Sequence, residues 1–282
     1  MLAIIESLRP KQWVKNVFVF APLVFSLQFM NFSAWLGAVF AAVAFVCVSG
    51  TVYIFNDIFD IESDRKHPTK KTRPIASGKL SIKAAWITAA FLLSISLIIA
   101  SLLPQGCGAV LLTYLIINVL YTKILKHVAV LDVIIISAGF VLRVIVGGLA
   151  IDVTISPWII LATFMVTLFM GFGKRRYELV HVSQKLRVSM QDYNKEFLDK
   201  LINVTCASTF ISYAIYAVET AQRIVKVELV YTVVFVAFGL FRYLHFLYLE
   251  KEGGAPEEIV FADKWFLGNA IIWLIVTVWI LT

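Results

Sequence analysis

The sequence predicts an all-α integral membrane protein. Of its 282 residues, 60% are hydrophobic and only 15% are charged, which is too apolar for a soluble domain of this length. Long apolar runs alternate with short polar segments, and most runs approach the roughly 20 residues that a helix needs to cross the hydrocarbon core. The basic residues behind the formal net charge of +7 lie mainly in the polar segments, where they orient a membrane protein and meet anionic head groups or phosphates. Nucleic acid is therefore not an expected partner.

Nine transmembrane helices are expected. The chain begins with an interfacial segment, residues 2–15, that carries Trp13 and several basic side chains. It lacks the features of a signal peptide, so the first span is expected to be retained. The predicted spans lie at about 16–30, 34–58, 84–103, 106–122, 129–150, 156–173, 200–219, 227–248 and 264–282.

The positive charge is strongly asymmetric across these spans. Of the 25 Lys and Arg residues, 22 fall in the N-terminal segment and in loops on the same side of the membrane. The positive-inside rule places that side in the cytoplasm, so we expect a multi-pass protein of the inner (plasma) membrane whose active site faces the cytoplasm. The two largest polar segments there are 59–83 and 174–199. With no domain boundary in the sequence, we expect a single transmembrane catalytic domain over 1–282.

An acidic segment ends the second apolar run, in Asn56-Asp57-Ile58-Phe59-Asp60-Ile61-Glu62-Ser63-Asp64. If the helix continues, Asp57, Asp60 and Asp64 fall on one face, and Asn56 reaches that face as the i, i+4 neighbour of Asp60. Like charges this close favour a bound cation, and oxygen ligands favour Mg²⁺, or Mn²⁺, over Zn²⁺. The alternative is a solvated helix end whose acids pair with the Lys and Arg that follow.

Arg143 is a full charge inside the predicted span 129–150. An ionisable side chain at that depth points to function and needs an anionic partner. A bound phosphate or one of the clustered acids would serve, and a buried structural pair between Arg and Asp is the alternative.

Three basic stretches border the spans on the cytoplasmic side. The segment 65–79 and the later Lys174-Arg175-Arg176-Tyr177-Glu178 could each hold phosphate oxygens, and the second could face the acidic segment across a cavity. Lys123 and Lys126 could add to the same wall. For all of them the alternative is a purely topological role.

The acidic pattern Asn56-Asp57-x-x-Asp60-x-x-x-Asp64, followed by Arg73-Pro74-x-x-Ser77-Gly78, resembles the first signature of the UbiA superfamily of intramembrane prenyltransferases. That resemblance covers nearly the whole chain and implies helices around a central cavity that opens to the cytoplasmic side. Ordinary members carry a second acidic motif, DxxxD, where this chain has the basic stretch 174–176. The stretches 8–16 and 254–260 instead resemble the branch that contains decaprenyl-phosphate phosphoribosyltransferase.

This branch moves a 5-phosphoribosyl group from phosphoribosyl pyrophosphate to a polyprenyl phosphate, and its product would be a precursor of cell-wall arabinan. The resemblance implies that Asp57 and Asp60 are catalytic and that they hold Mg²⁺, or Mn²⁺, together with Asn56 and Asp64. The substrate-binding residues would be Lys15, Asn16, Tyr53, Arg65, Lys66, Arg73, Lys123, Lys126, Arg143, Lys174, Arg175, Arg176, Tyr177 and Glu178. The expected partners are therefore phosphoribosyl pyrophosphate, a polyprenyl phosphate lipid and the bilayer.

Two other functions stay open at this point. A prenyltransferase that acts on an aromatic acceptor such as a hydroxybenzoate needs the same metal cluster, but normally also a second acidic cluster. A transporter of a phosphorylated or lipid-linked solute would place charged residues along the whole transmembrane path, whereas this chain keeps nearly all of them on one side. The oligomeric state is also open, with a homo-oligomer among the options.

Overall fold

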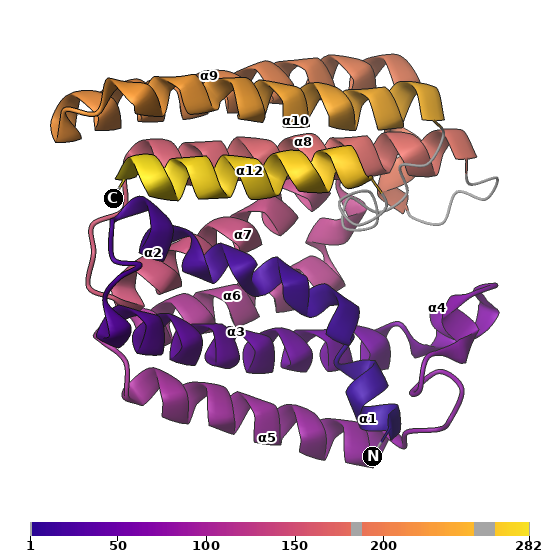
Figure 1. Cartoon of the computed structure of the whole chain (residues 1–282). Helices are drawn as coiled ribbons and strands as arrows, with labels where there is room; N and C mark the ends of the chain where they lie inside the picture. Colours follow the sequence, from indigo (N-terminus) through magenta and orange to yellow (C-terminus); the bar gives the residue numbers. More distant parts are fainter. Residues whose placement is uncertain (1, 182–187, 251–262, 282) are drawn as a thin grey trace. The chain divides into compact units, whose positions relative to one another are not determined.

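The computed structural model describes residues 2–181, 188–250 and 263–281, and all regular structure in these ranges is helical (Figure 1). The sequence stretch 254–260 lies outside them. Two compact units emerge from the contacts along the chain: the N-terminal unit comprises Met1–Leu125 and Leu142–Thr154, and the C-terminal unit comprises Lys126–Val141 and Ile155–Thr282. The expectation of one catalytic domain over 1–282 stays a prediction.

The N-terminal unit is built around two long neighbouring helices, α3 (Phe32–Phe59) and α5 (Ile82–Ser101), which lie side by side in Figure 1. Shorter elements accompany them. These are α1 (Leu2–Ser7), the 3₁₀ helix η1 (Pro10–Phe20), α2 (Ala21–Phe25), α4 (Ile61–Lys66), the 3₁₀ turn η2 (Lys70–Thr72) and α6 (Cys107–Lys123).

Small and hydroxylated side chains bring α3 and α5 together. Asn31 caps the start of α3, accepting hydrogen bonds from the backbone of Ser33 and Ala34. The hydroxyl of Ser96 donates to the Ala44 carbonyl at 2.9 Å, and both side chains are fully buried. Small residues let membrane helices approach closely, and hydroxyl bonds between helices then satisfy polar groups that lipid cannot.

Helix α7 (Leu131–Ala150) contributes its first half to the C-terminal unit and its second half to the N-terminal unit. In the N-terminal unit, Gly147 lies directly against the backbone of Val19 in η1, because a Cβ placed on it would overlap the Val19 carbonyl. Glycine at this position therefore permits a backbone contact that no other residue allows.

The C-terminal unit packs α8 (Pro157–His181) against α9 (Lys195–Ile224), with α10 (Val233–His245) and α12 (Lys264–Leu281) beside them (Figure 1). Short turns complete it: η3 (Leu125–His127), which straddles the boundary, η4 (Val188–Asp192), η5 (Val227–Thr232) and the π-helical turn η6 (Phe246–Glu250). Its core centres on buried Phe169, Phe172 and Tyr243.

The helices reproduce most of the predicted spans. Seven described helical stretches are long and apolar enough to cross a membrane, and α6 is a shorter apolar helix where the span 106–122 was expected. The first expected span, 16–30, is not one α-helix, because 3₁₀ structure runs to Phe20 and α2 ends at Phe25. The chain is thus a multi-pass membrane protein, and the count of nine crossings stays a prediction.

Candidate functional site

The acidic segment lies at the junction of α3 and α4 in the N-terminal unit. Helix α3 ends at Phe59, Asp60 occupies the break, and α4 starts one residue later. The backbone continues almost helically through this break, since the Asp60 amide donates to Asn56 at 2.9 Å and the Asp64 amide donates to Asp60 at 2.8 Å. Consequently Asp57 and Asp64 stay on one face, as the helical spacing predicts, and both are 2% exposed.

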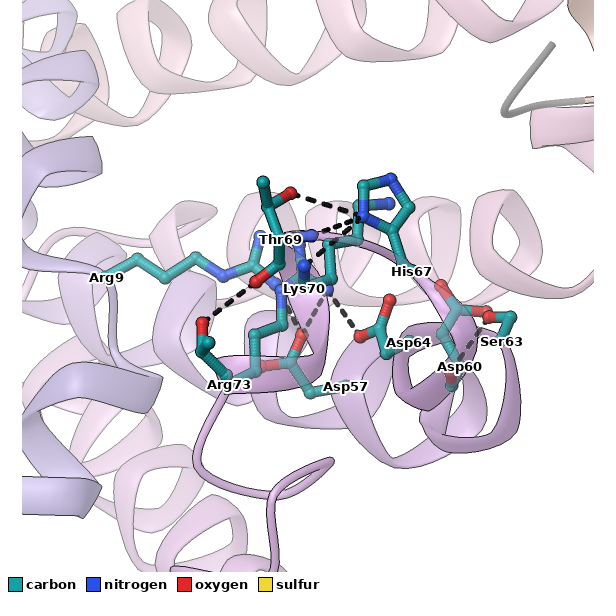
Figure 2. A network of polar contacts seen from close by, with 10 residues as sticks. Arg9, Asp57, Asp60, Ser63, Asp64, His67, Thr69, Lys70 and Arg73 are labelled. Atoms are coloured by element: carbon teal, nitrogen blue, oxygen red, sulfur yellow. Dashed lines mark hydrogen bonds and ion pairs between the residues drawn. The ribbon is translucent and has the colours of Figure 1, made fainter. Parts of the chain in front are cut away.

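Two arginines neutralise these buried carboxylates. Arg73 Nη1 donates to Asp57 Oδ1 at 3.1 Å and to Asp64 Oδ2 at 2.7 Å, so a single guanidinium nitrogen bridges the two acids (Figure 2). Arg9 Nη2 donates to the same Asp57 oxygen. Its guanidinium carbon also lies 5.0 Å from the ring centre of Tyr53, a residue of α3 expected to bind substrate. Arg73 is one of the basic residues that follow the acids, as the alternative interpretation expected, but Arg9 precedes them and the two carboxylates are buried rather than solvated.

Asp60 and Asn56 take other positions. Asp60 lies beside Ser63, whose hydroxyl donates to the Asp60 backbone carbonyl at 2.8 Å (Figure 2). The Asn56 side-chain oxygen accepts a hydrogen bond from the hydroxyl of Thr122 at the end of α6. Over the described ranges, no group of three or more His, Cys, Asp or Glu side chains lies close enough to hold a metal ion. The expected metal set therefore stays a prediction, and the acids that share a partner are Asp57 and Asp64.

A tight turn between α4 and η2 positions Arg73. His67 Nδ1 accepts hydrogen bonds from the backbone amides of Thr69 at 3.2 Å and Lys70 at 3.3 Å. Burial, and secondarily the charge of Lys70, lowers the pKa of His67, which favours the neutral ring that can accept these bonds. The Arg73 amide in turn donates to the Lys70 carbonyl at 3.0 Å. The turn thus fixes the backbone from which Arg73 reaches the acids.

Two further predicted substrate-binding residues, Lys123 and Arg65, contact other groups of the N-terminal unit. Lys123 is exposed, and its ammonium lies 5.3 Å from the centre of the Phe59 ring. Phe59 directly precedes Asp60 in the sequence. Arg65 donates through Nε to the Ala76 carbonyl at 3.1 Å. Lys66 is exposed and Lys15 is half-buried. Lys126 is also half-buried and is the first residue of the C-terminal unit.

Arg143 is 4% exposed inside the N-terminal unit. Its Nε donates to Asn16 Oδ1 at 2.9 Å, and its Nη2 donates to the hydroxyl of Tyr114 at 3.3 Å. The guanidinium carbon also lies 4.5 Å and 5.0 Å from the ring centres of Phe45 and Tyr114. Arg143 thus contacts neutral oxygens and aromatic faces, and one of these oxygens belongs to Asn16, which was also expected to bind substrate.

In the C-terminal unit, Arg175 is a buried ion-pair residue. It donates to Asp132 at 2.8 Å and to Glu178 at 2.8 Å, and it is 2% exposed. Tyr193 donates to the other Asp132 oxygen at 2.8 Å. Burial, together with the Asp132 charge, raises the pKa of Tyr193 far above its usual value and keeps this hydroxyl a donor.

Arg176 has a similar environment. It donates to Asp199 at 2.5 Å and to the Leu247 carbonyl at 3.0 Å, and its guanidinium carbon stacks 4.0 Å from the Tyr248 ring centre. These contacts tie α8 to α9 and η6. Arg175 and Arg176 therefore already have protein carboxylates as partners, whereas half-buried Lys174 stays a predicted phosphate ligand. Tyr177 stacks on the ring of His181, with centroids 4.4 Å apart.

Sequence reasoning did not include several of these residues among the site candidates. The sequence offered some indication of Arg9, because this residue belongs to the basic N-terminal stretch. Its partner Asp57, however, is 48 positions away. It also offered one of Asp132, as an acid at the start of a predicted span. Nothing local distinguished Asp199 or Tyr193.

Comparisons with known proteins agree with this architecture. The chain matches the model of the UbiA prenyltransferase family over residues 17–267. It is 32% identical to the decaprenyl-phosphate phosphoribosyltransferase of Corynebacterium glutamicum, covering 96% of this chain and 84% of the relative. It is 30% identical to the protein of that name from Mycobacterium tuberculosis, covering 96% of this chain and 91% of the relative.

Solved structures share the fold. A UbiA homolog from Archaeoglobus fulgidus, bound to DMAPP and Mg²⁺, superposes with a TM-score of 0.77 at 18% identity, covering 99% of this chain and 98% of that chain. A structure of digeranylgeranylglyceryl phosphate synthase superposes with a TM-score of 0.62 at 16% identity, covering 99% and 97%. Together with the family match over most of its length, these likenesses show that the chain is a membrane transferase that belongs to the UbiA prenyltransferase family.

Proposed function

We propose that this protein transfers the 5-phosphoribosyl group of phosphoribosyl pyrophosphate to a polyprenyl phosphate and releases pyrophosphate. The observation that carries the proposal is the similarity, over nearly the whole chain, to relatives named decaprenyl-phosphate phosphoribosyltransferase. The chain has residues 174–176 in the place of a second acidic motif, which counts against prenyl transfer to an aromatic acceptor.

The donors at the acidic segment fit a hard divalent cation. Asp57 and Asp64 present buried carboxylates that share one cationic partner, and carboxylate oxygens are the protein ligands that Mg²⁺ and Mn²⁺ prefer. Asp60 and Asn56 belong to the same segment, where Asp60 lies beside Ser63 and Asn56 accepts a hydrogen bond from Thr122. We propose Asp57, Asp60 and Asp64 as the ligands, with Asn56 beside them. The bound ion would neutralise charge on the departing pyrophosphate.

Apart from the metal ion, the transfer requires few catalytic groups from the protein. A new bond forms between a phosphate oxygen of the lipid and C1 of the ribose, while the bond from C1 to the pyrophosphate oxygen breaks and its electron pair leaves with pyrophosphate. The acceptor is already an anion, with a second pKa of about 6, so no general base is needed. The cationic side chains near the acids, Arg73 and Lys123, would bind phosphate oxygens and orient the donor.

The membrane setting follows from the same reasoning. Basic residues flank the spans on one side, so we propose that the site faces the cytoplasm from the inner membrane. There the soluble donor and the lipid acceptor can meet. The polyprenyl tail would remain in the apolar phase.

Prenyl transfer to an aromatic acceptor is the second candidate, because the family as a whole is named for prenyltransferases. A product assay separates the two. Purified protein with Mg²⁺ is incubated with polyprenyl phosphate and radiolabelled phosphoribosyl pyrophosphate, and we expect label in the lipid phase and free pyrophosphate. If the lipid stays unlabelled while a hydroxybenzoate is prenylated from a prenyl diphosphate, the proposal is wrong.

A further inference from the structure

The charges around Asp57 and Asp64 balance within the protein. Two buried carboxylates are matched by two guanidinium groups, from Arg9 and Arg73. A divalent cation carries the same charge as these two side chains together. An isolated carboxylate buried away from water is strongly disfavoured, so a partner must be present whether or not a ligand is bound.

Both guanidinium groups reach the acids from separate segments. Arg9 lies between α1 and η1 with a positive φ of 51°, a left-handed conformation that is uncommon for a non-glycine residue. Arg73 lies after the turn of residues 67–72, and its side chain is 25% exposed, close to the 28% of Arg9. Thus the cations can reach solvent while the carboxylates cannot.

We propose that Arg9 and Arg73 are internal counter-ions that a divalent cation displaces from Asp57 and Asp64. The released guanidinium groups then turn to the phosphates of the incoming donor. The identity of that donor rests on the proposed function, whereas the exchange of cations at the carboxylates does not.

The exchange makes metal and phosphate binding interdependent. A metal ion that binds alone repels both guanidinium groups and leaves them without their carboxylates. A phosphate ligand that binds alone removes the cations from two buried acids. Each ligand alone therefore binds weakly, and each strengthens the other by the same factor.

Metal binding without any donor tests this directly. The affinity of the purified full-length protein for Mn²⁺ is measured by the loss of the free-ion signal in electron paramagnetic resonance. We expect Arg73→Gln and Arg9→Gln to bind Mn²⁺ alone at least about tenfold more tightly than the wild type, within the range of ordinary coupling energies. Arg73→Lys keeps the charge but not the bridging geometry. Its affinity for Mn²⁺ should lie between those of the wild type and Arg73→Gln.

Arg65→Gln is the matched control. It removes the same charge from the same segment, but Arg65 donates to the Ala76 carbonyl. Its effect on Mn²⁺ affinity measures the general electrostatic contribution and should be several-fold smaller. Arg9 and Arg73 variants that bind Mn²⁺ no more tightly than this control overturn the proposal. So does a protein that binds no Mn²⁺ in any variant.

A second titration measures the coupling itself. Affinity for pyrophosphate is determined with and without Mn²⁺, using free concentrations corrected for the complex that the two form in solution. We expect Mn²⁺ to tighten pyrophosphate binding at least about fivefold in the wild type and clearly less in Arg73→Gln. Equal coupling in both contradicts the exchange. If Mn²⁺ binding follows these expectations but the protein does not transfer a phosphoribosyl group, the proposed function is wrong and the cation exchange still holds.

Discussion

At the scale of the residue, burial separates the charged groups of this protein into two kinds. Asp57 and Asp64 are buried acids whose cationic partners are partly exposed, so those partners can be replaced. Arg175 and Asp132 are both buried, at 2% and 0% side-chain exposure, so loss of Arg175 would leave the Asp132 carboxylate buried without its cation. The first arrangement suits ligand binding and the second suits structure.

Substitution of the acids tests the first arrangement. We expect Asp57→Asn and Asp60→Asn each to lower kcat at least about 100-fold, because a bound metal supplies several kcal/mol of charge stabilisation. Labelled donor turnover is the measurement, and detergent-solubilised protein with an unchanged elution profile is the control. Substantial activity in both variants would remove the metal assignment.

The buried pair should respond in stability rather than in substrate binding. Arg175→Met leaves the buried Asp132 carboxylate without its cation and should cost about 3–5 kcal/mol, whereas Asp132→Asn should cost less, because Glu178 still pairs with Arg175. Thermal unfolding of the purified protein measures this. The double variant Arg175→Met/Asp132→Leu should recover much of the loss, since an apolar pair of similar volume tolerates burial. Single variants with an unchanged Tm but a raised donor KM would make Arg175 a ligand instead.

At the scale of the element, backbone contacts and caps decide how helices end and meet. Gly147 lets α7 lie against η1, and a Cβ there overlaps the Val19 carbonyl, which cannot rotate away. Gly147→Ala should therefore destabilise the protein by about 1–3 kcal/mol or more. Gly108→Ala in α6 is the control, because its Cβ would meet only the Ala100 side chain at an ordinary 3.8 Å. Equal Tm values for the two variants would contradict the close approach.

The start of α12 provides a pH-dependent contact. Asp263 accepts the Phe266 amide as a helix cap and pairs with Arg242 at 2.7 Å, and the Arg242 hydrogen bond lowers the pKa of this carboxyl. A lowered acid pKa adds stability that is present above the unfolded-state pKa of about 4 and is lost as the pH falls through the folded-state pKa. Asp263→Asn keeps a capping oxygen but not the charge.

The Tm difference between the wild type and Asp263→Asn should thus be constant above about pH 5 and shrink in acid, as the native carboxyl becomes protonated. Thermal unfolding across this range measures it. A difference that persists at the lowest pH would mean that the ion pair does not contribute.

At the scale of the whole molecule, the sequence predicted what depends on local pattern. Span positions followed from the length of apolar runs, and the shared face of Asp57 and Asp64 followed from helical spacing. The partners of these charges did not follow, because they are distant in sequence: Asp132 lies 43 positions from Arg175. Consecutive basic residues look alike whether they anchor a helix, bind phosphate or pair inside the protein.

The break of the first predicted span had a local cause that hydropathy does not register. Pro22 lies inside the predicted span, where a proline cannot donate the backbone hydrogen bond of a continuous helix, and the chain there passes from 3₁₀ structure to a five-residue helix. An apolar run of sufficient length was therefore not enough to predict a regular α-helix.

The central claim concerns which group the enzyme transfers, and a single competition experiment addresses it. Purified protein with Mg²⁺ is given phosphoribosyl pyrophosphate, a prenyl diphosphate, polyprenyl phosphate and a hydroxybenzoate together, and the products are identified by mass spectrometry. The account predicts polyprenyl phosphate that has gained one phosphoribosyl group, with pyrophosphate released in equal amount and none of either product from Asp57→Asn. A prenylated hydroxybenzoate with unmodified polyprenyl phosphate would contradict it.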